Sequence, residues 1–158
     1  MAADLAPQSK AYLVDSDVPA VELARENLRR NGVANAVAVE SDGFSALDNL
    51  AFDAIATNPP FHVGRLQTTA VALQFVEQSA RHLRRGGRFY LVADRFLKYE
   101  PAVEAAFGNV QTVAETSRYK VLLTAGRVED AAPLEARREY RPRPEAQASD
   151  VLAVRQRR

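Results

Sequence analysis

Short apolar runs alternate with amphipathic helical segments along residues 10–125, and this alternation constrains the fold more than any other feature. The apolar runs have the length of buried strands and lie at residues 10–14, 36–39, 52–57 and 88–93. Helical spacing of apolar residues predicts helices between Asp17 and Asn31 and over 68–85, with short helices between 40 and 52 and over 99–107. Strands separated by helices form parallel sheets covered on both faces. We therefore expect an α/β domain with an open, mostly parallel sheet.

The ends of the predicted elements carry ordinary capping and turn residues. Ser16 or Asp17 is the expected N-cap of the first helix, and Asn31-Gly32 is its expected end. Gly86-Gly87 is expected to stop the helix over 68–85. The last two strands, 110–116 and 119–124, are separated only by a tight turn near Ser117-Arg118. This closing hairpin requires an antiparallel strand at one end of the sheet.

Composition excludes several classes of site and gives no argument for others. The chain of 158 residues has no cysteine, so disulfides, zinc–cysteine sites and cysteine nucleophiles are excluded. Two histidines leave little for a metal site, and we expect none. No apolar run reaches the ~20 residues of a membrane span, and the N-terminus lacks the layout of a signal peptide. We therefore expect a cytoplasmic protein without membrane contact; the net charge of +1 is no argument for nucleic acid.

Polar residues follow three of the predicted strands. These residues are Asp15, Asp42 and Asn58. Ligands of open α/β sheets bind beyond the carboxyl ends of the strands. The sequence therefore predicts a binding site at this edge of the sheet.

Asn58-Pro59-Pro60-Phe61 is the strongest chemical signal in the chain. Asparagine offers an acceptor and a donor, while the two prolines fix φ and remove backbone donors. A stiff loop of this kind can present acceptors to the N–H groups of a planar amine, with an aromatic ring to stack on it. The structural alternative is a Pro-Pro turn with a capping asparagine.

With these residues the chain resembles the class I S-adenosylmethionine-dependent methyltransferases, and most closely the RsmC-like rRNA guanine-N2 methyltransferases. The resemblance covers about residues 3–125 and rests on several stretches. They are Leu13-Val14-Asp15, the run from Ala24 to Gly32, Phe52-Asp53 leading into Asn58-Pro59-Pro60-Phe61-His62, the run from His82 to Gly87, the run from Val92 to Tyr99, and Arg118-Tyr119-Lys120-Val121. Asn-Pro-Pro-Phe alone is shared with adenine-N6 and glutamine-N5 methyltransferases. His62 and the Arg118-Tyr119-Lys120-Val121 ending narrow the resemblance to the rRNA group.

The resemblance implies a Rossmann-like fold and S-adenosylmethionine as the cofactor. Asp15 would accept hydrogen bonds from both ribose hydroxyls, and Asp42 would contact the adenine amino group. Gly43 and Phe44 would lie beside the adenine ring, and Asn58 would also touch the cofactor. For Asp15 and Asp42, a helix cap or a solvated strand end is the alternative role.

The resemblance also implies the substrate contacts. Asn58 and the Pro59 carbonyl would accept hydrogen bonds from an exocyclic amine, and Phe61 would stack on the flipped base. Pro60, His62 and Arg65 would line the substrate pocket. Arg118 would join Arg65, Arg95 and Lys98 in one phosphate-binding face, with rRNA or a ribosomal subunit as the partner. For His82, inside a predicted helix, we expect a structural role.

Two features depart from the family pattern. The family's strand order is 3-2-1-4-5-7-6, so its first strand is central in the sheet. This first strand and the Gly-rich loop after it should precede Lys10. Only nine residues precede Lys10, and none of them is glycine. We therefore expect an N-terminally truncated domain at 1–125 that binds S-adenosylmethionine weakly or not at all. We also expect an empty place, or new strand pairing, at the centre of the sheet. Residues 126–158, with eight arginines and six acidic residues, are expected to be a disordered tail.

Three functions stay open on sequence alone. The first is methylation of a guanine N2 amine of small-subunit rRNA. The second is methylation of adenine N6 or of a protein glutamine. The third is a catalytically inactive, methyltransferase-like module.

Overall fold

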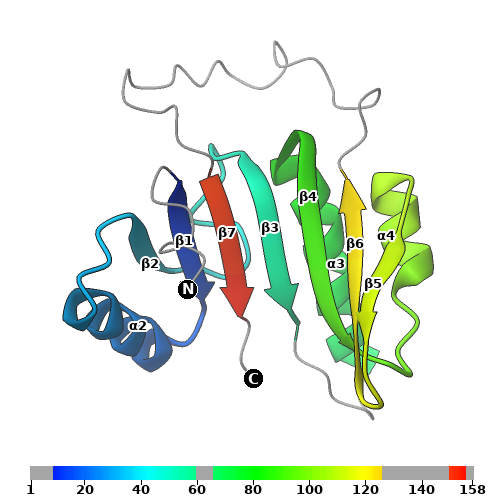
Figure 1. The fold of residues 1–158 in the computed structure, drawn as a ribbon, viewed down its shortest axis with the longest axis horizontal. Coiled ribbons are helices and arrows are strands. Elements are labelled where there is room, and N and C mark those ends of the chain that lie inside the picture. Colours follow the sequence, from blue (N-terminus) through cyan, green and yellow to red (C-terminus); the bar gives the residue numbers. More distant parts are fainter. Residues whose placement is uncertain (1–8, 60–65, 126–149, 156–158) are drawn as a thin grey trace.

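Seven strands and three helices make up the part of the chain that the computed structural model describes, residues 9–59, 66–125 and 150–155 (Figure 1). In chain order they are β1 (Lys10–Asp15), α2 (Val18–Arg30), β2 (Ala36–Glu40), β3 (Phe52–Asn58), α3 (Leu66–His82), β4 (Leu83–Asp94), α4 (Glu100–Phe107), β5 (Gln111–Glu115), β6 (Tyr119–Ala125) and β7 (Asp150–Arg155).

The strands form one sheet in the order β2-β1-β7-β3-β4-β6-β5. β2, β1, β7, β3 and β4 run parallel to one another, whereas β6 is antiparallel to β4 and to β5. The mostly parallel α/β sheet with a closing antiparallel hairpin is therefore confirmed. The order is also that of the class I methyltransferases, with β7 at the place of their first strand.

Strand β7 is the main difference from the sequence-based expectation. It lies between β1 and β3 and is parallel to both, with Leu13 and Ala56 each level with Ala153. The prediction of a disordered tail is therefore wrong for residues 150–155, and the centre of the sheet is neither empty nor closed by pairing of β1 with β3. The physical reason is that the facing edges of β1 and β3 both offer unpaired backbone groups, which a strand between them satisfies. The rest of the predicted tail lies outside the described residues.

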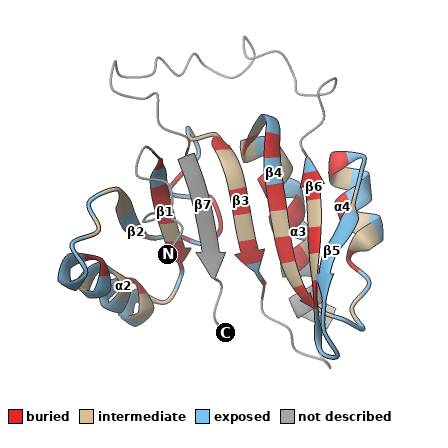
Figure 2. Cartoon of the chain, viewed as in Figure 1, coloured by how far each residue is buried: buried red, intermediate tan, exposed pale blue. Residues whose placement is uncertain are grey.

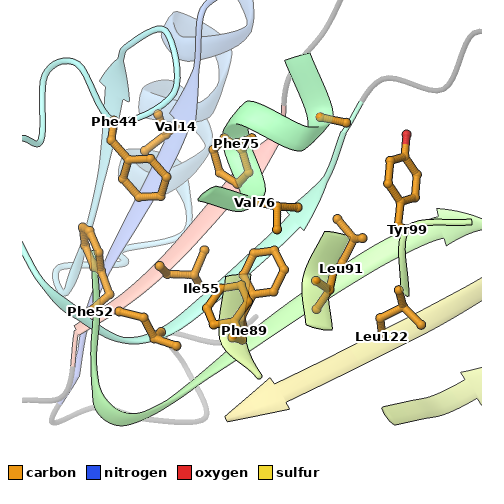
Figure 3. Close-up of a cluster of buried hydrophobic side chains, with 14 of the residues drawn as sticks. Val14, Phe44, Phe52, Ile55, Phe75, Val76, Phe89, Leu91, Tyr99 and Leu122 are labelled. Carbon is orange, nitrogen blue, oxygen red and sulfur yellow. The ribbon is translucent and has the colours of Figure 1, made fainter. Parts of the chain in front are cut away.

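Helices cover the two faces of the sheet unequally. Side chains alternate between the faces of a strand, and Leu13 of β1 packs with Val21 and Leu28 of α2, whereas Tyr12 and Val14 belong to the larger core. The larger core lies on the face that carries α3 and α4, and it includes fully buried Phe52, Ile55, Phe89, Leu91 and Leu122 (Figure 3). On the opposite face of β4, Tyr90 and Val92 are only half-buried (Figure 2).

The first helix and the hairpin are formed as predicted. The N-cap of α2 is Asp17 and its C-cap is Asn31, although the Asp17 side chain makes no capping hydrogen bond. In the turn between β5 and β6, the Thr116 N–H donates to the Tyr119 carbonyl at 2.7 Å, and the Thr116 hydroxyl oxygen accepts from the N–H of Tyr119 at 2.9 Å. The short helix over 99–107 is confirmed as α4.

Two predicted elements differ from the structure. Residues 41–51 form successive turns and no helix. The predicted helix over 68–85 ends at His82, and β4 begins at Leu83. The cause is a bulge in which Leu83 is level with Phe52 but Arg88 is level with Ala54, so the extra residues loop out at Gly86, whose φ of 74° suits glycine.

Candidate functional site at the carboxyl edge of the sheet

The predicted site residues of β1 and β3 lie at the same edge of the sheet, on either side of β7. The parallel register places Asn58 level with Arg155, while Val14 and Thr57 are both level with Val154. Asp15 and Asn58 therefore end their strands at the same height. Two strand spacings separate them, which is about 10 Å.

Asp15 is a buried carboxylate with a fixed orientation. The residue is 8% exposed, its Oδ1 accepts the N–H of Asp17 at 3.0 Å, and its backbone carbonyl accepts the N–H of Ser41 at 3.0 Å. Part of the alternative role is thus present, because the side chain supports the turn that leads into α2. The other carboxylate oxygen has no hydrogen bond to the described residues, so it is available to accept one from a ligand hydroxyl.

The loop after β2 displays Asp42 and buries the two residues that follow it. Asp42 is exposed, whereas Gly43 and Phe44 are buried. Gly43 has a φ of 58°, and a Cβ there would lie 2.9 Å from Oε1 of Gln78. The Ser41 hydroxyl braces the loop by donating to the Gly43 carbonyl at 3.1 Å and accepting the N–H of Ala46 at 3.0 Å.

The Phe44 ring belongs to the core of the protein. It stacks on His82 with 4.4 Å between centroids and on Phe75 with 5.1 Å between centroids. The His82 Nδ1 is 2.8 Å from the Leu50 carbonyl oxygen, so the expected structural role of His82 is confirmed. Phe44 is only 2% exposed. Cofactor contacts by Asp42, Gly43 and Phe44 stay predictions.

Asn58 and Pro59 end β3 with opposite exposures. Asn58 is exposed and Pro59 is buried. The buried proline therefore fixes the backbone directly after the exposed asparagine. Immediately before them, Thr57 is 2% exposed and its hydroxyl has no hydrogen-bond partner among the described residues. The predicted substrate residues Pro60, Phe61, His62 and Arg65 lie outside the described residues.

A turn after β4 gathers exposed basic residues beside the hairpin. The N–H of Arg95 donates to the Arg118 carbonyl at 2.8 Å, and the Arg95 guanidinium forms a 2.7 Å ion pair with Glu115. Lys98 and Arg118 are exposed in the same region. Of the four residues of the predicted phosphate-binding face, Arg95 and Lys98 thus lie in this turn and Arg118 lies in the adjoining turn of the β5–β6 hairpin. Arg65 is outside the described residues.

Two features of this region were not predicted from the sequence. One is Phe96, an aromatic residue in the basic turn that is 82% exposed. The other is a buried cation, because the Lys120 side chain is 7% exposed and forms a 2.5 Å ion pair with Glu100 at the start of α4. Burial disfavours the charged form of Glu100, but the hydrogen bond and charge of Lys120, with backbone hydrogen bonds, outweigh it and lower the pKa of Glu100. Lysine is rarely buried without a partner, so the Lys120-Val121 pair in a strand-like run was the available signal.

The described part of the chain shows neither a metal site nor a membrane-spanning helix. Within residues 9–59, 66–125 and 150–155, no group of three or more histidine or acidic side chains is arranged to hold a metal ion. None of the helices in this part of the chain is long and apolar enough to cross a membrane.

Comparison with known families decides what kind of domain this is. The family model of the methyltransferase small domain matches residues 1–123. The chain belongs to this family. The relatives of this methyltransferase small domain include the ribosomal RNA small subunit methyltransferase C of Shewanella amazonensis, 42% identical over 115 residues, and that of Klebsiella pneumoniae, 41% identical over 119 residues. These matches cover 73% and 75% of this chain and 33% and 34% of the relatives, so the chain spans about a third of their length.

Solved structures agree with the family assignment. The 16S rRNA N2 methyltransferase RsmC of Thermus thermophilus, solved in complex with AdoMet and guanosine, is 42% identical with a TM-score of 0.67. The match covers 75% of this chain and 32% of that chain. A methyltransferase from Pyrococcus furiosus, 22% identical with a TM-score of 0.57 over 75% of this chain and 64% of that one, shares the fold.

Proposed function

We propose that this domain transfers a methyl group from S-adenosylmethionine to the N2 amine of a guanine in small-subunit rRNA. The observation that carries the proposal is the placement of Asn58, at the head of Asn58-Pro59-Pro60-Phe61, on the sheet edge that also holds Asp15. The 42% identity to an enzyme solved with AdoMet and guanosine supports the same assignment.

The cofactor is expected to lie between the ends of β1 and β3. Asp15 fits a ribose, because a fixed carboxylate oxygen accepts hydrogen bonds from a diol. Asp42 and the backbone of Gly43 are the candidates for the adenine end. When bound, S-adenosylmethionine supplies an electrophilic methyl group.

The residues around Asn58 position the amine. A guanine N2 amine is a weak nucleophile because its lone pair is delocalised into the ring. The Asn58 carboxamide oxygen and the Pro59 carbonyl would accept its two N–H groups and aim the lone pair. Positioning and fixed dipoles then supply most of the acceleration. Phe61 would hold the unstacked base, with Pro60, His62, Arg65 and Arg118 around it.

The test is methyl transfer from labelled S-adenosylmethionine to unmethylated small ribosomal subunits, followed by nucleoside analysis. We expect N2-methylguanosine, and we expect Asn58→Ala to lower turnover on the order of 100-fold, by analogy with the removal of one transition-state hydrogen bond. Cofactor affinity should change much less, because Asn58 acts mainly on the substrate. Label in N6-methyladenosine or in protein would replace the guanine assignment, and no transfer at all would favour an inactive module.

Cofactor affinity is measured separately by calorimetric titration. The weak binding expected from the sequence stays a prediction, and a micromolar dissociation constant would show it to be wrong. A substrate in a ribosomal subunit also implies a cytoplasmic location.

A further inference from the structure

Phe96 is the most exposed large apolar side chain among the described residues. It is 82% exposed, in the turn that connects β4 to α4. Burial of a phenylalanine side chain away from water is favourable, and this side chain does not gain that stabilisation within the described fold. This makes the surface around Phe96 a candidate for contact with another molecule.

The turn holds Phe96 in a defined position. The N–H of Phe96 donates to Oδ1 of Asp94 at 3.1 Å, and the N–H of Leu97 donates to the Asp94 carbonyl at 3.1 Å. On its C-terminal side, Leu97 packs against the main core and Tyr99 is 4% exposed. The backbone of the turn is thus fixed at both ends, and the Phe96 ring is presented by an ordered segment.

The surroundings of Phe96 are basic and aromatic. Arg95, Lys98 and Arg118 are exposed, and of these the Arg95 guanidinium is paired with Glu115. The Arg118 guanidinium carbon lies 5.1 Å from the centroid of the Tyr119 ring. Exposed rings among cations are the combination with which proteins bind single-stranded nucleic acid, because bases stack on the rings and phosphates pair with the cations.

The position of Phe96 relative to Asn58 fits a base that flanks the target. β4 is the neighbour of β3, and Thr57 is level with Leu91, so Asn58 is level with Val92, four residues before Phe96. β4 ends at Asp94, two residues beyond Val92, so by the spacing between and along strands the turn that carries Phe96 begins within about 10 Å of Asn58. The end of β4 and the turn of the β5–β6 hairpin lie at the same end of the sheet (Figure 1).

We propose that Phe96 is a stacking platform for an unpaired nucleobase of the RNA that flanks the target guanine. The proposal rests on the proposed rRNA substrate and adds a contact that no catalytic step requires. A protein partner would also cover an exposed ring, but Lys98 and Arg118 beside it favour a polyanion.

The experiment measures equilibrium binding of a fluorescent single-stranded rRNA segment to the full chain, without cofactor, by anisotropy. We expect Phe96→Ala and Phe96→Leu to weaken binding about 5- to 100-fold, the range that base stacking on an aromatic side chain gives. Phe96→Trp should stay within about twofold of the original chain, since a larger ring still stacks. The matched control is Leu23→Ala on α2, a side chain that is 62% exposed, and it should leave binding unchanged.

Two outcomes would overturn the proposal. Unchanged binding by Phe96→Ala would exclude an RNA contact, and full binding by Phe96→Leu would mean that apolar contact, as in a protein interface, replaces stacking. Methyl transfer to free guanosine separates this proposal from the proposed function. Turnover on the nucleoside tests the chemistry alone and should not change in Phe96→Ala, whereas RNA binding tests the platform alone.

Discussion

The sheet consists of two halves that are built differently. On one side of β7, β2 and β1 pack on α2 through a small core of Val21, Leu28 and Ala38. On the other side, β3, β4, β6 and β5 carry α3 and α4 over a large aromatic core (Figure 3). Asp15 belongs to the first half and Asn58 to the second, so the candidate site exists only while the halves are joined.

Two kinds of contact join the halves. β7 pairs through its backbone with β1 on one side and β3 on the other. Across this junction, the rings of Tyr12 and Phe52 meet edge to face with 5.5 Å between centroids, and Phe44 stacks on Phe75. The spacing of the site therefore depends on a strand far away in sequence and on aromatic packing close to it.

The largest expected effect separates the two cores. Phe89 is fully buried and stacks on Phe107, so Phe89→Ala should lower the free energy of unfolding by about 3–5 kcal/mol. Leu28 is 7% exposed in the small core, and Leu28→Ala should cost about 2 kcal/mol, at the low end for such substitutions. Urea unfolding measures both. Equal losses would mean that the two halves are equally well packed.

The next effect breaks the junction itself. Leu152 lies in the middle of β7, where it is level with Tyr12 and Ile55, and proline there removes a backbone donor from a central strand. We expect Leu152→Pro to lower the free energy of unfolding by about 3 kcal/mol. Leu152→Ala keeps the backbone N–H of this residue, so it is the matched control and should be less destabilising. If the two variants were equally stable, pairing of β7 would not hold the halves together.

The strands and the hairpin could be predicted because their signals are local. Apolar runs of strand length, capping residues and the turn at Thr116 each act within a few residues. By the same reasoning, Asp15 and Asn58 were expected to share an edge, and they do. The bulge at Gly86 was not predicted, because the glycine pair at 86–87 has the same local signature as the end of a helix.

The position of β7 and the exposure of Phe96 could not be predicted because both depend on the rest of the molecule. Val151–Val154 is an apolar run of strand length, but nothing local says that it fits between β1 and β3. Phe96 and Leu97 are adjacent apolar residues that the sequence does not distinguish. In the folded turn, which is held by hydrogen bonds to Asp94, Leu97 packs against the core and Phe96 does not. Sequence patterns predict individual helices and strands well, but they predict poorly which strands or side chains lie next to each other in the fold.

A double-mutant cycle measures the aromatic part of the junction. Tyr12→Leu and Phe52→Leu should each be destabilising, and their combination should be less costly than the sum by about 0.5–1.5 kcal/mol, the usual coupling of an edge-to-face pair. The control pair is Tyr12→Leu with Phe107→Leu. The Phe107 ring stacks on Phe89 in the larger core, so the effects of these two substitutions should be additive. Additivity of Tyr12 and Phe52 would show that their contact does not connect the halves.

A substitution of Thr57, the residue before Asn58 in β3, tests the packing of the junction beside the candidate site. Its buried hydroxyl has no hydrogen-bond partner among the described residues, and such a group costs free energy that an apolar isostere removes. Thr57→Val should therefore raise the free energy of unfolding by about 1 kcal/mol, measured by urea unfolding. Thr124→Val is the matched control and should be destabilising, because the Thr124 hydroxyl donates to the Asn109 side-chain oxygen at 2.8 Å.

The smallest effect concerns a contact within the larger half, where Lys120 of β6 pairs with Glu100 of α4. The folded pKa of Glu100 is below its ordinary value of 4.5, so the pair contributes stability that is fully present above about pH 4.5 and is lost as the pH falls through the lower folded pKa. Glu100→Gln should flatten the pH dependence of stability below pH 4.5, by less than about 1 kcal/mol because the carboxylate is partly exposed. Lys120→Met removes the charge that lowers the pKa of Glu100, so it should flatten the same slope. An unchanged slope in Glu100→Gln would mean that Lys120 is held by packing and not by charge.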